Sequence, residues 1–229
     1  MSKSKKTQHI LIIGGMGPQA GAHTLKRLID VSSEYSSGMN EDYPRVTYLS
    51  LNVEDFISDS SKKDVALAYI LDCLKDVNLA NVNKGFIACN TAHLLFGEIQ
   101  MNVSFELLSL IDVTKDYLAN TTSIKKVGLL ATPTTIQTGL YSPDLFDTKE
   151  IVLPTKSSSL RLEGIIRKMI RGVDAKDLIQ DFQKEADALY AQGVDAIIVG
   201  CTELSMIAHE IQDSRIIDPI EQITRRILA

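Results

Sequence analysis

The feature that most constrains this chain is a pattern that occurs twice: a short apolar run ends at a cysteine, and small polar residues follow. The first copy is GFIACNT around Cys89, and the second is AIIVGCTE around Cys201. Such runs are typical of buried strands, so we expect each thiol where a strand ends and a helix begins. Free N–H groups at a helix N-terminus lower the pKa of a thiol and also bind carboxylates. A single buried cysteine is usually structural, whereas two in matching settings favour a shared chemical role.

Strand-like runs alternate with helix-like runs along the chain, which predicts an α/β fold with mostly parallel sheets. The strands are expected at residues 10–13, 46–51, 85–88, 107–111, 126–131, 151–153, 194–199 and 215–217. Apolar residues recur at helical spacing in the segments 19–31, 64–79, 159–170 and 175–191, which predicts helices there.

The two halves of the chain also resemble each other in the order of their segments. KVGLLATPTT has the place in the second half that HILIIGGMGP has in the first, and RIIDPIEQI echoes LLSLIDVTK. This order predicts two similar α/β lobes related by a pseudo-twofold axis, with Cys89 and Cys201 facing each other across the cleft between them. We expect the first lobe at residues 1–115, the second at 116–215, and a C-terminal helix at 216–229 that returns to the first lobe.

Composition narrows the class of function. The 229 residues are 45% hydrophobic and carry a formal net charge of −5, which favours a large core and disfavours nucleic-acid partners. No apolar run approaches the roughly 18 residues that a membrane span needs, and no signal-peptide pattern is seen, so we expect a cytoplasmic protein. The three cysteines and four histidines lack disulfide or zinc-ligand spacing. A small-molecule partner and no metal are expected.

Two loops that follow strands offer hydrogen-bond donors to an anion. The glycines of GGMGP at residues 14–18 allow the backbone to present N–H groups. GMGPQA also matches the GxGxxA dinucleotide pattern, but Pro18 removes one N–H group and the next acidic pair lies beyond the usual spacing. A carboxylate-sized ligand is therefore favoured. Thr132 and Thr135 follow the matching strand of the second half, where they bind an anion or only cap a helix.

In their order along the chain, these motifs resemble those of the cofactor-independent aspartate/glutamate racemases, in particular the aspartate racemase branch. The motifs are GGMGP at 14–18, CNTAH at 89–93, GLLAT at 128–132 and GCTEL at 200–204. The resemblance spans nearly the whole chain. It implies two Rossmann-like lobes that enclose the substrate, and an amino-acid racemase that needs no cofactor. In that family a cysteine from each lobe is one of two bases, which implies Cys89 and Cys201 here.

The resemblance also implies the residues that surround the substrate. Those that would hold it are Met16, Ser50, Asn90, Thr91, Thr132, Thr135 and Thr202. One cysteine, as thiolate, would remove the α-proton while the other, as thiol, delivers a proton to the opposite face. His93 and Glu203 are candidates to tune the cysteines, although a satisfied helix histidine explains His93 equally well. Cys73 lies on an expected helix and is assigned to the core.

Two departures from the family pattern concern the substrate side chain. The arginine that follows the second strand in aspartate racemases corresponds to Ile57 here, and a lysine of the second lobe corresponds to Ile170. The resemblance assigns cationic residues at these places to the side-chain carboxylate of the substrate. Either Arg161, Arg167 or Arg171 compensates, or the substrate side chain is neutral.

Two other functions remain open from the sequence. One is a single-cysteine isomerase or decarboxylase of the same superfamily, which the second cysteine disfavours. The other is a non-catalytic binding protein for amino acids or nucleotides on the same scaffold. Incorporation of solvent deuterium at the α-carbon distinguishes a racemase from a binder. The oligomeric state is also open, with a homodimer as the candidate assembly.

Overall fold

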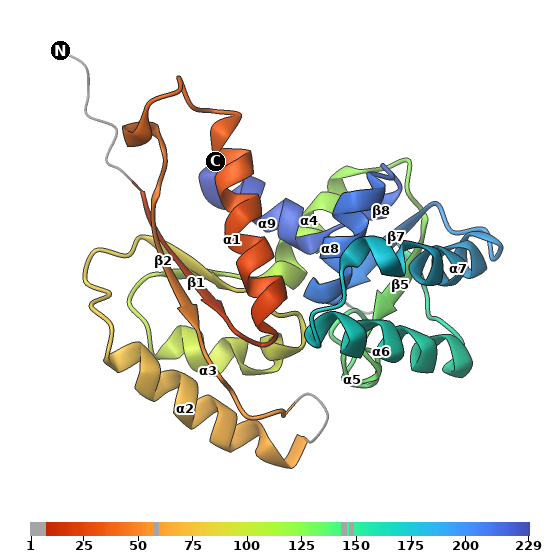
Figure 1. Ribbon diagram of the computed structural model, residues 1–229, viewed down its shortest axis with the longest axis horizontal. Coiled ribbons are helices and arrows are strands. Elements are labelled where there is room, and N and C mark those ends of the chain that lie inside the picture. The colour runs from red at the N-terminus through yellow and green to blue at the C-terminus, as the bar shows by residue number, and fades with distance from the viewer. Residues whose placement is uncertain (1–7, 57–59, 143–145, 147–148) are drawn as a thin grey trace.

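A computed structural model of the chain describes residues 8–56, 60–142, 146 and 149–229 and contains two β-sheets flanked by helices (Figure 1). In the first sheet the strand order is β2 (Arg45–Ser50), β1 (His9–Gly14), β3 (Lys84–Ile87) and β4 (Glu106–Leu108). In the second sheet the order is β6 (Glu150–Val152), β5 (Lys126–Ala131), β7 (Ala196–Gly200) and β8 (Ile216–Ile217). All adjacent strands pair in parallel. The predicted α/β fold with two similar lobes is therefore confirmed.

Helices fill the connections between these parallel strands, as long crossovers usually do. Along the first half of the chain they are α1 (Pro18–Ser33), α2 (Lys63–Lys75), α3 (Phe96–Met101) and α4 (Leu110–Asn120), with the short 3₁₀ helices η1 (Asn40–Asp42), η2 (Ser60–Lys62) and η3 (Thr91–Leu95). Along the second half they are α5 (Pro133–Gln137), α6 (Lys156–Ile170), η5 (Ala175–Leu178), α7 (Ile179–Tyr190), α8 (Thr202–Ile211) and α9 (Pro219–Leu228). Across the described ranges, no helix combines the length and the hydrophobicity that a membrane span requires.

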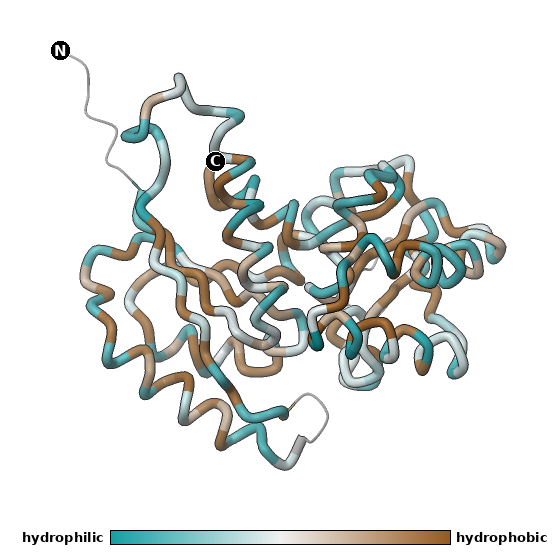
Figure 2. Tube along the Cα trace, in the orientation of Figure 1, coloured by the Kyte–Doolittle hydropathy of each residue, from teal (hydrophilic) through white to brown (hydrophobic). Residues whose placement is uncertain are grey.

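The first sheet is covered on both faces because successive residues of its central strand point in opposite directions. Leu11 and Ile13 of β1 pack with side chains of α2 and α3, while Ile10 and Ile12 pack on the other face with Leu28 of α1. All residues of β1 are buried, which explains the continuous apolar run at residues 10–13 within this strand. Figure 2 shows hydrophobic residues along the strands and hydrophilic residues on outer helix turns.

The second sheet is covered in the same way. Leu130 and Val199 pack with side chains of α6, α7 and α8 on one face. Leu129 and Ile198 pack on the other face with Leu118 of α4. Each sheet thus has its own hydrophobic layers.

Helix α4 follows the first sheet in the chain and contributes to both cores. Leu110 packs in the core of the first sheet, and Leu118 packs against the second. The C-terminal helix α9 places Ile223 in the first-sheet core and packs beside α1 and α4. The lobe boundaries at 1–115, 116–215 and 216–229 stay a prediction.

Several elements differ from their expected bounds; the helix expected at 64–79, for example, ends at Lys75. The strand expected at 107–111 ends at Leu108, because the Ser109 side chain accepts a hydrogen bond from Asp112 N at 3.1 Å and caps α4. The helix expected at 175–191 is divided into η5 and α7. Helices α3 and α5 have only six and five residues. Segments this short contain too few turns for a helical period to be visible in the sequence.

Candidate active site between the two lobes

A cavity of about 590 Å³ lies between the two lobes, where the central strands of both sheets end. The first lobe lines it with residues 15–18, 53–56 and 89–91, and the second lines it with residues 132–134, 137, 163, 166, 167, 170, 171 and 201–203. Parallel α/β sheets bind ligands outside the carboxyl ends of their strands. The volume is also typical of small-molecule sites. The cavity is therefore the candidate active site.

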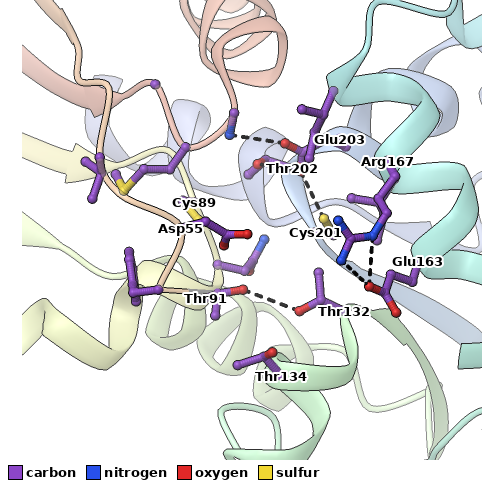
Figure 3. Close-up of a pocket in the computed structure, with 18 of the residues that line it drawn as sticks. Asp55, Cys89, Thr91, Thr132, Thr134, Glu163, Arg167, Cys201, Thr202 and Glu203 are labelled. Carbon is purple, nitrogen blue, oxygen red and sulfur yellow. Dashed lines mark hydrogen bonds and ion pairs between the residues drawn. The ribbon is translucent and has the colours of Figure 1, made fainter. Parts of the chain in front are cut away.

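Cys89 and Cys201 line this cavity from opposite lobes (Figure 3). Cys89 follows β3, while Cys201 follows β7 and is the N-cap residue of α8. Both residues are buried, with exposed fractions of 4% and 6%. The structure thus brings the two thiols together at one cavity, at strand ends where the sequence places them.

Burial dominates the electrostatics of both thiols. The pKa of Cys89 is raised to about 12, chiefly by burial and next by the charge of Glu203, while the backbone N–H groups of Thr91 and Ala92 oppose the increase. Burial also raises the pKa of Cys201 well above its usual value, and Glu203 adds to this through its charge and its hydrogen bond. The low thiol pKa expected at a helix N-terminus is therefore not found at either cysteine. Both are thiols at neutral pH in the unliganded protein.

One buried carboxylate, that of Glu203, contacts both lobes. Its Oε2 accepts a hydrogen bond from Cys201 Sγ at 3.0 Å, and its Oε1 accepts one from Gly17 N at 3.2 Å (Figure 3). Thr202 Oγ1 also donates to Oε2, at 3.4 Å. A buried charge needs such donors because it has lost its contact with water. Glu203 thus lies against Cys201 and connects helix α8 to the loop after β1.

Three threonine hydroxyl groups form a buried cluster across the lobe boundary. Thr91 Oγ1 lies 2.8 Å from Thr135 Oγ1 and 3.4 Å from Thr132 Oγ1. Thr132 also caps α5, because its Oγ1 accepts a hydrogen bond from Thr135 N at 3.1 Å. Thr91 and Thr132 line the cavity, whereas Thr135 is fully buried and does not line it. Thr132 therefore both caps helix α5 and lines the cavity.

Asn90 is held by a hydrogen bond from the other lobe. Tyr141 Oη donates to Asn90 Oδ1 at 2.5 Å, and both residues are almost fully buried. Asn90 Nδ2 has no hydrogen-bond partner among the described residues. A buried donor without a partner costs free energy, so a ligand that accepts a bond from Nδ2 would be favoured. No sequence motif indicates Tyr141, because its contact joins positions that are 51 residues apart.

His93 holds the backbone of Cys89 rather than its sulfur. Leu110 N donates to His93 Nε2 at 2.9 Å, so Nδ1 carries the proton and donates to the Cys89 carbonyl oxygen at 2.9 Å. Burial lowers the pKa of His93 to about 4. The imidazole is therefore neutral at physiological pH and links the end of β3 to the start of α4.

The remaining residues named from the sequence have different positions relative to the cavity. Met16 and Thr202 line it. Ser50 is exposed at the end of β2 and is not among the lining residues. Cys73 is partly buried on α2 and packs against the first-sheet core, as expected. Ile57 lies outside the described residues.

Ile170, the second departure from the family pattern, lies on α6 (Lys156–Ile170), and the three arginines that are candidates to compensate for it lie on or next to the same helix. Ile170 lines the cavity and has an exposed fraction of 45%. Arg167 and Arg171 also line the cavity. Arg161 pairs instead with Glu185 of α7, with Nε and Oε1 2.5 Å apart, and does not line it. Among the three arginines, Arg167 and Arg171 therefore border the cavity, and Arg161 does not.

No motif in the sequence indicates the acidic residues of the cavity, such as Asp55 and Glu163. Arg167 donates to Glu163 Oε1 from Nε at 2.9 Å and from Nη2 at 2.6 Å (Figure 3). Glu163 and Arg167 share one face of α6 with Ile166 and Ile170, at the i, i+3, i+4, i+7 spacing of a helix face. That spacing was visible in the sequence. Only the fold shows that this face borders the cavity.

Comparison with known proteins identifies the family. The family model described as Asp/Glu/Hydantoin racemase matches residues 13–227. The chain belongs to this family. Among curated relatives, the broad specificity amino-acid racemase RacX of Bacillus subtilis (strain 168) is 25% identical over 205 residues, which cover 88% of both chains. A glutamate racemase of Aquifex aeolicus (strain VF5) is 24% identical over 177 residues, covering 76% of this chain and 68% of the relative.

Solved structures resemble the whole chain. An aspartate racemase homologue from Pyrococcus horikoshii OT3 has a TM-score of 0.74 at 25% identity and covers 96% of this chain and 97% of its own. The aspartate racemase of Picrophilus torridus has a TM-score of 0.77 at 23% identity, with coverage of 96% and 93%. These likenesses confirm the predicted fold. The family match confirms the predicted racemase family and, with the curated relatives, supports an amino-acid racemase as the class of enzyme.

Proposed function

We propose that this chain is an amino-acid racemase in which Cys89 and Cys201 act as acid and base at the α-carbon of the substrate. The observation that carries the proposal is that both thiols line one cavity from opposite lobes. Two proton-transfer groups on opposite sides of a carbon can invert it, because one removes the proton and the other protonates the opposite face. Membership of the Asp/Glu/Hydantoin racemase family supports the same reaction.

The proton balance of this reaction requires one thiolate and one thiol. One cysteine first releases its proton to solvent as the substrate binds, and its thiolate then takes the α-proton and becomes a thiol. The other cysteine gives its proton to the opposite face and becomes the thiolate. Because the pKa of both Cys89 and Cys201 is raised, the α-ammonium group of the substrate is the charge that we assign to stabilise the first thiolate. When the product leaves, the new thiolate takes up a proton from solvent, and both cysteines are thiols again.

Loss of the α-proton moves negative charge onto the substrate carboxylate. We assign the N–H groups of Gly15 and Met16, the hydroxyl groups of Thr91 and Thr132, and Asn90 Nδ2 to hold this carboxylate, because these residues line one cavity and these groups can donate hydrogen bonds. Donors that are already in place stabilise the enediolate without the cost of reorganising water.

Other predicted site residues have supporting roles in this proposal. Thr135 fixes the hydroxyl groups of the threonine cluster. His93 and Glu203 hold the cysteines by hydrogen bonds. Met16 and Thr202 bound the substrate. A substrate contact of Ser50 stays a prediction.

The decisive test is incorporation of solvent deuterium. We expect the purified protein, incubated with a panel of L- and D-amino acids in D₂O, to lose optical purity and gain one deuterium at Cα, measured by chiral chromatography and mass spectrometry. An amino-acid-binding protein would bind members of the panel without exchange. A single-cysteine isomerase or decarboxylase would consume a substrate without forming its enantiomer. Either outcome would contradict the two-thiol racemase.

The proposed reaction needs no added cofactor. Two thiols supply both acid and base, so we expect full activity without an added cofactor. Within the described residues, no group of three or more His, Cys, Asp or Glu side chains is arranged to hold a metal ion. Activity that depended on an added cofactor would contradict the proposal. A homodimer and a cytoplasmic location stay predictions.

A further inference from the structure

The wall of the cavity that α6 forms contains an ion pair. Arg167 donates to Glu163 Oε1 from both Nε and Nη2, at 2.9 and 2.6 Å, and both residues line the cavity. Figure 3 shows the pair on the second-lobe side, across the cavity from Asp55. A side-chain carboxylate of a substrate would meet this guanidinium group. That guanidinium group is already paired with the carboxylate of Glu163.

The charges of the other lining residues act in the same direction. Four carboxylates and two guanidinium groups line the cavity, and these are Glu54, Asp55, Glu163, Glu203, Arg167 and Arg171. Glu54 is also paired with Lys62, with Oε1 and Nζ 2.7 Å apart. Like charges repel more strongly in a partly desolvated cavity than in water. A second carboxylate on the substrate is therefore repelled by these groups, and it can pair with the guanidinium group of Arg167 only if Glu163 releases that group.

We propose that Glu163 is a specificity-determining residue, which neutralises Arg167 and so disfavours amino acids that carry a side-chain carboxylate. The inference rests on the proposed racemase function. A dicarboxylate substrate must displace Glu163 before it can form its own charge-paired hydrogen bonds with Arg167. A substrate with a neutral side chain leaves the pair intact.

The pair can be altered without a large effect on folding. The side chains of Arg167 and Glu163 are 52% and 32% exposed, and they are spaced i,i+4 on one helix. Exposed pairs of this kind contribute little to stability. Glu163→Gln keeps the size of the side chain and removes its charge, so its effect reports on the cavity.

The test compares aspartate with asparagine, which has nearly the same shape and no side-chain charge. We expect Glu163→Gln to raise the ratio of kcat/KM for aspartate over asparagine by about tenfold, which corresponds to about 1.4 kcal/mol. The gain should be mainly a lower KM for aspartate. The matched control is Asp181→Asn, which removes a carboxylate from Lys168 of α6, outside the cavity lining. It should leave the ratio unchanged.

A double variant identifies the cation. Adding Arg167→Met to Glu163→Gln should abolish the gain, whereas adding Arg171→Met should preserve it. A ratio that does not change in an active Glu163→Gln protein overturns the inference, and so does a gain that survives the loss of Arg167.

A binding measurement separates this inference from the proposed function. Succinate carries two carboxylates and no amino group, and its Kd can be measured by calorimetry on the whole protein. We expect Glu163→Gln to bind succinate at least about fivefold more tightly than the wild type, a change that a freed guanidinium readily supplies. Absence of racemisation with every amino acid would contradict the proposed function alone. Unchanged succinate affinity would contradict the role of Glu163 alone.

Discussion

The thiol of Cys201 donates a hydrogen bond to the Glu203 carboxylate, with Sγ and Oε2 3.0 Å apart. The other oxygen of the same carboxylate accepts the backbone N–H of Gly17, which belongs to the opposite lobe. One side chain therefore contacts a proposed proton donor and the loop that closes the cavity from the other side. A change at Glu203 should affect both the protonation of the thiol and the fit between the lobes.

Glu203→Gln should move the pH dependence of catalysis to lower pH. Burial is the main reason for the raised pKa of Cys201, and the charge of Glu203 adds to it. Removal of that charge lowers the pKa of the thiol, so the thiolate forms at lower pH and the acid limb of kcat/KM shifts downward. The control is Glu210→Gln, an exposed residue at the end of α8. An acid limb that stays in place would show that Glu203 does not influence the reacting thiol.

Gly17→Ala should reduce activity while the protein stays folded. A Cβ atom at Gly17 would lie 2.9 Å from Glu203 Oε1, closer than such contacts normally are, so the carboxylate must move away from Gly17 N. We expect kcat/KM to fall by about tenfold, or about 1.4 kcal/mol of transition-state stabilisation. Gly97→Ala is the matched control, because nothing lies within 4 Å of its Cβ position. Equal activity of the two variants would contradict the coupling.

Cys89→Ser and Cys201→Ser should each lower racemisation by at least about 100-fold, since an alcohol is a far weaker acid than a thiol. Both sites accept the small change in volume, so the melting temperature should change little. Cys73→Ser, on α2 away from the cavity, should keep full activity. Nearly full turnover by Cys89→Ser would show that Cys89 is not an essential base and would favour the single-cysteine alternative.

The buried imidazole of His93 should make the folded state sensitive to acid. Burial lowers its pKa to about 4 from 6.5, so the unfolded chain takes up a proton between these values and the folded chain does not. This group therefore stabilises the fold above pH 6.5, and about 3 kcal/mol of that stability is lost as the pH falls to about 4. Urea unfolding of the wild type and of His93→Gln at several pH values measures this change in the free energy of unfolding. His93→Gln should be less stable at neutral pH and should show a shallower slope in this window. An unchanged slope would contradict the assignment.

Aspartate should not be clearly preferred over neutral polar amino acids. Ile170 stands where a lysine is expected, and Arg167 is engaged by Glu163. A charge-paired hydrogen bond contributes about 1.5–3 kcal/mol, so its loss removes most of the advantage of a dicarboxylate. Steady-state kinetics over a panel of amino acids gives the comparison. A value of kcat/KM for aspartate at least about 100-fold above the neutral substrates would contradict the expectation and indicate that an arginine binds the substrate directly.

Local patterns in the sequence determined the strand ends at which the cysteines lie. Runs such as GFIA and AIIVG are buried because helices cover both faces of a parallel sheet and exclude water from its strands. Polar residues that begin a helix follow each run directly. The order of these runs was enough to predict two similar lobes and to place Cys89 and Cys201 on one cavity. The resemblance of the sequence to a known family extended the predicted site to the threonines and Asn90.

Contacts between residues far apart in the chain were decided only by the tertiary structure. Gly17 and Glu203 meet across 186 positions, and Tyr141 reaches Asn90 from the other lobe. Such pairs depend on how the two sheets are packed, which no local spacing encodes.

The protonation of the thiols was also decided by tertiary structure. A helix N-terminus, which the sequence shows, lowers a thiol pKa, but burial and the charge of Glu203 raise it by more at Cys201. The helix spacing that puts Glu163 and Arg167 on one face is visible in the sequence, whereas the side of α6 that borders the cavity is not. Desolvation and packing depend on all the atoms that surround a group, and these atoms come from every part of the chain.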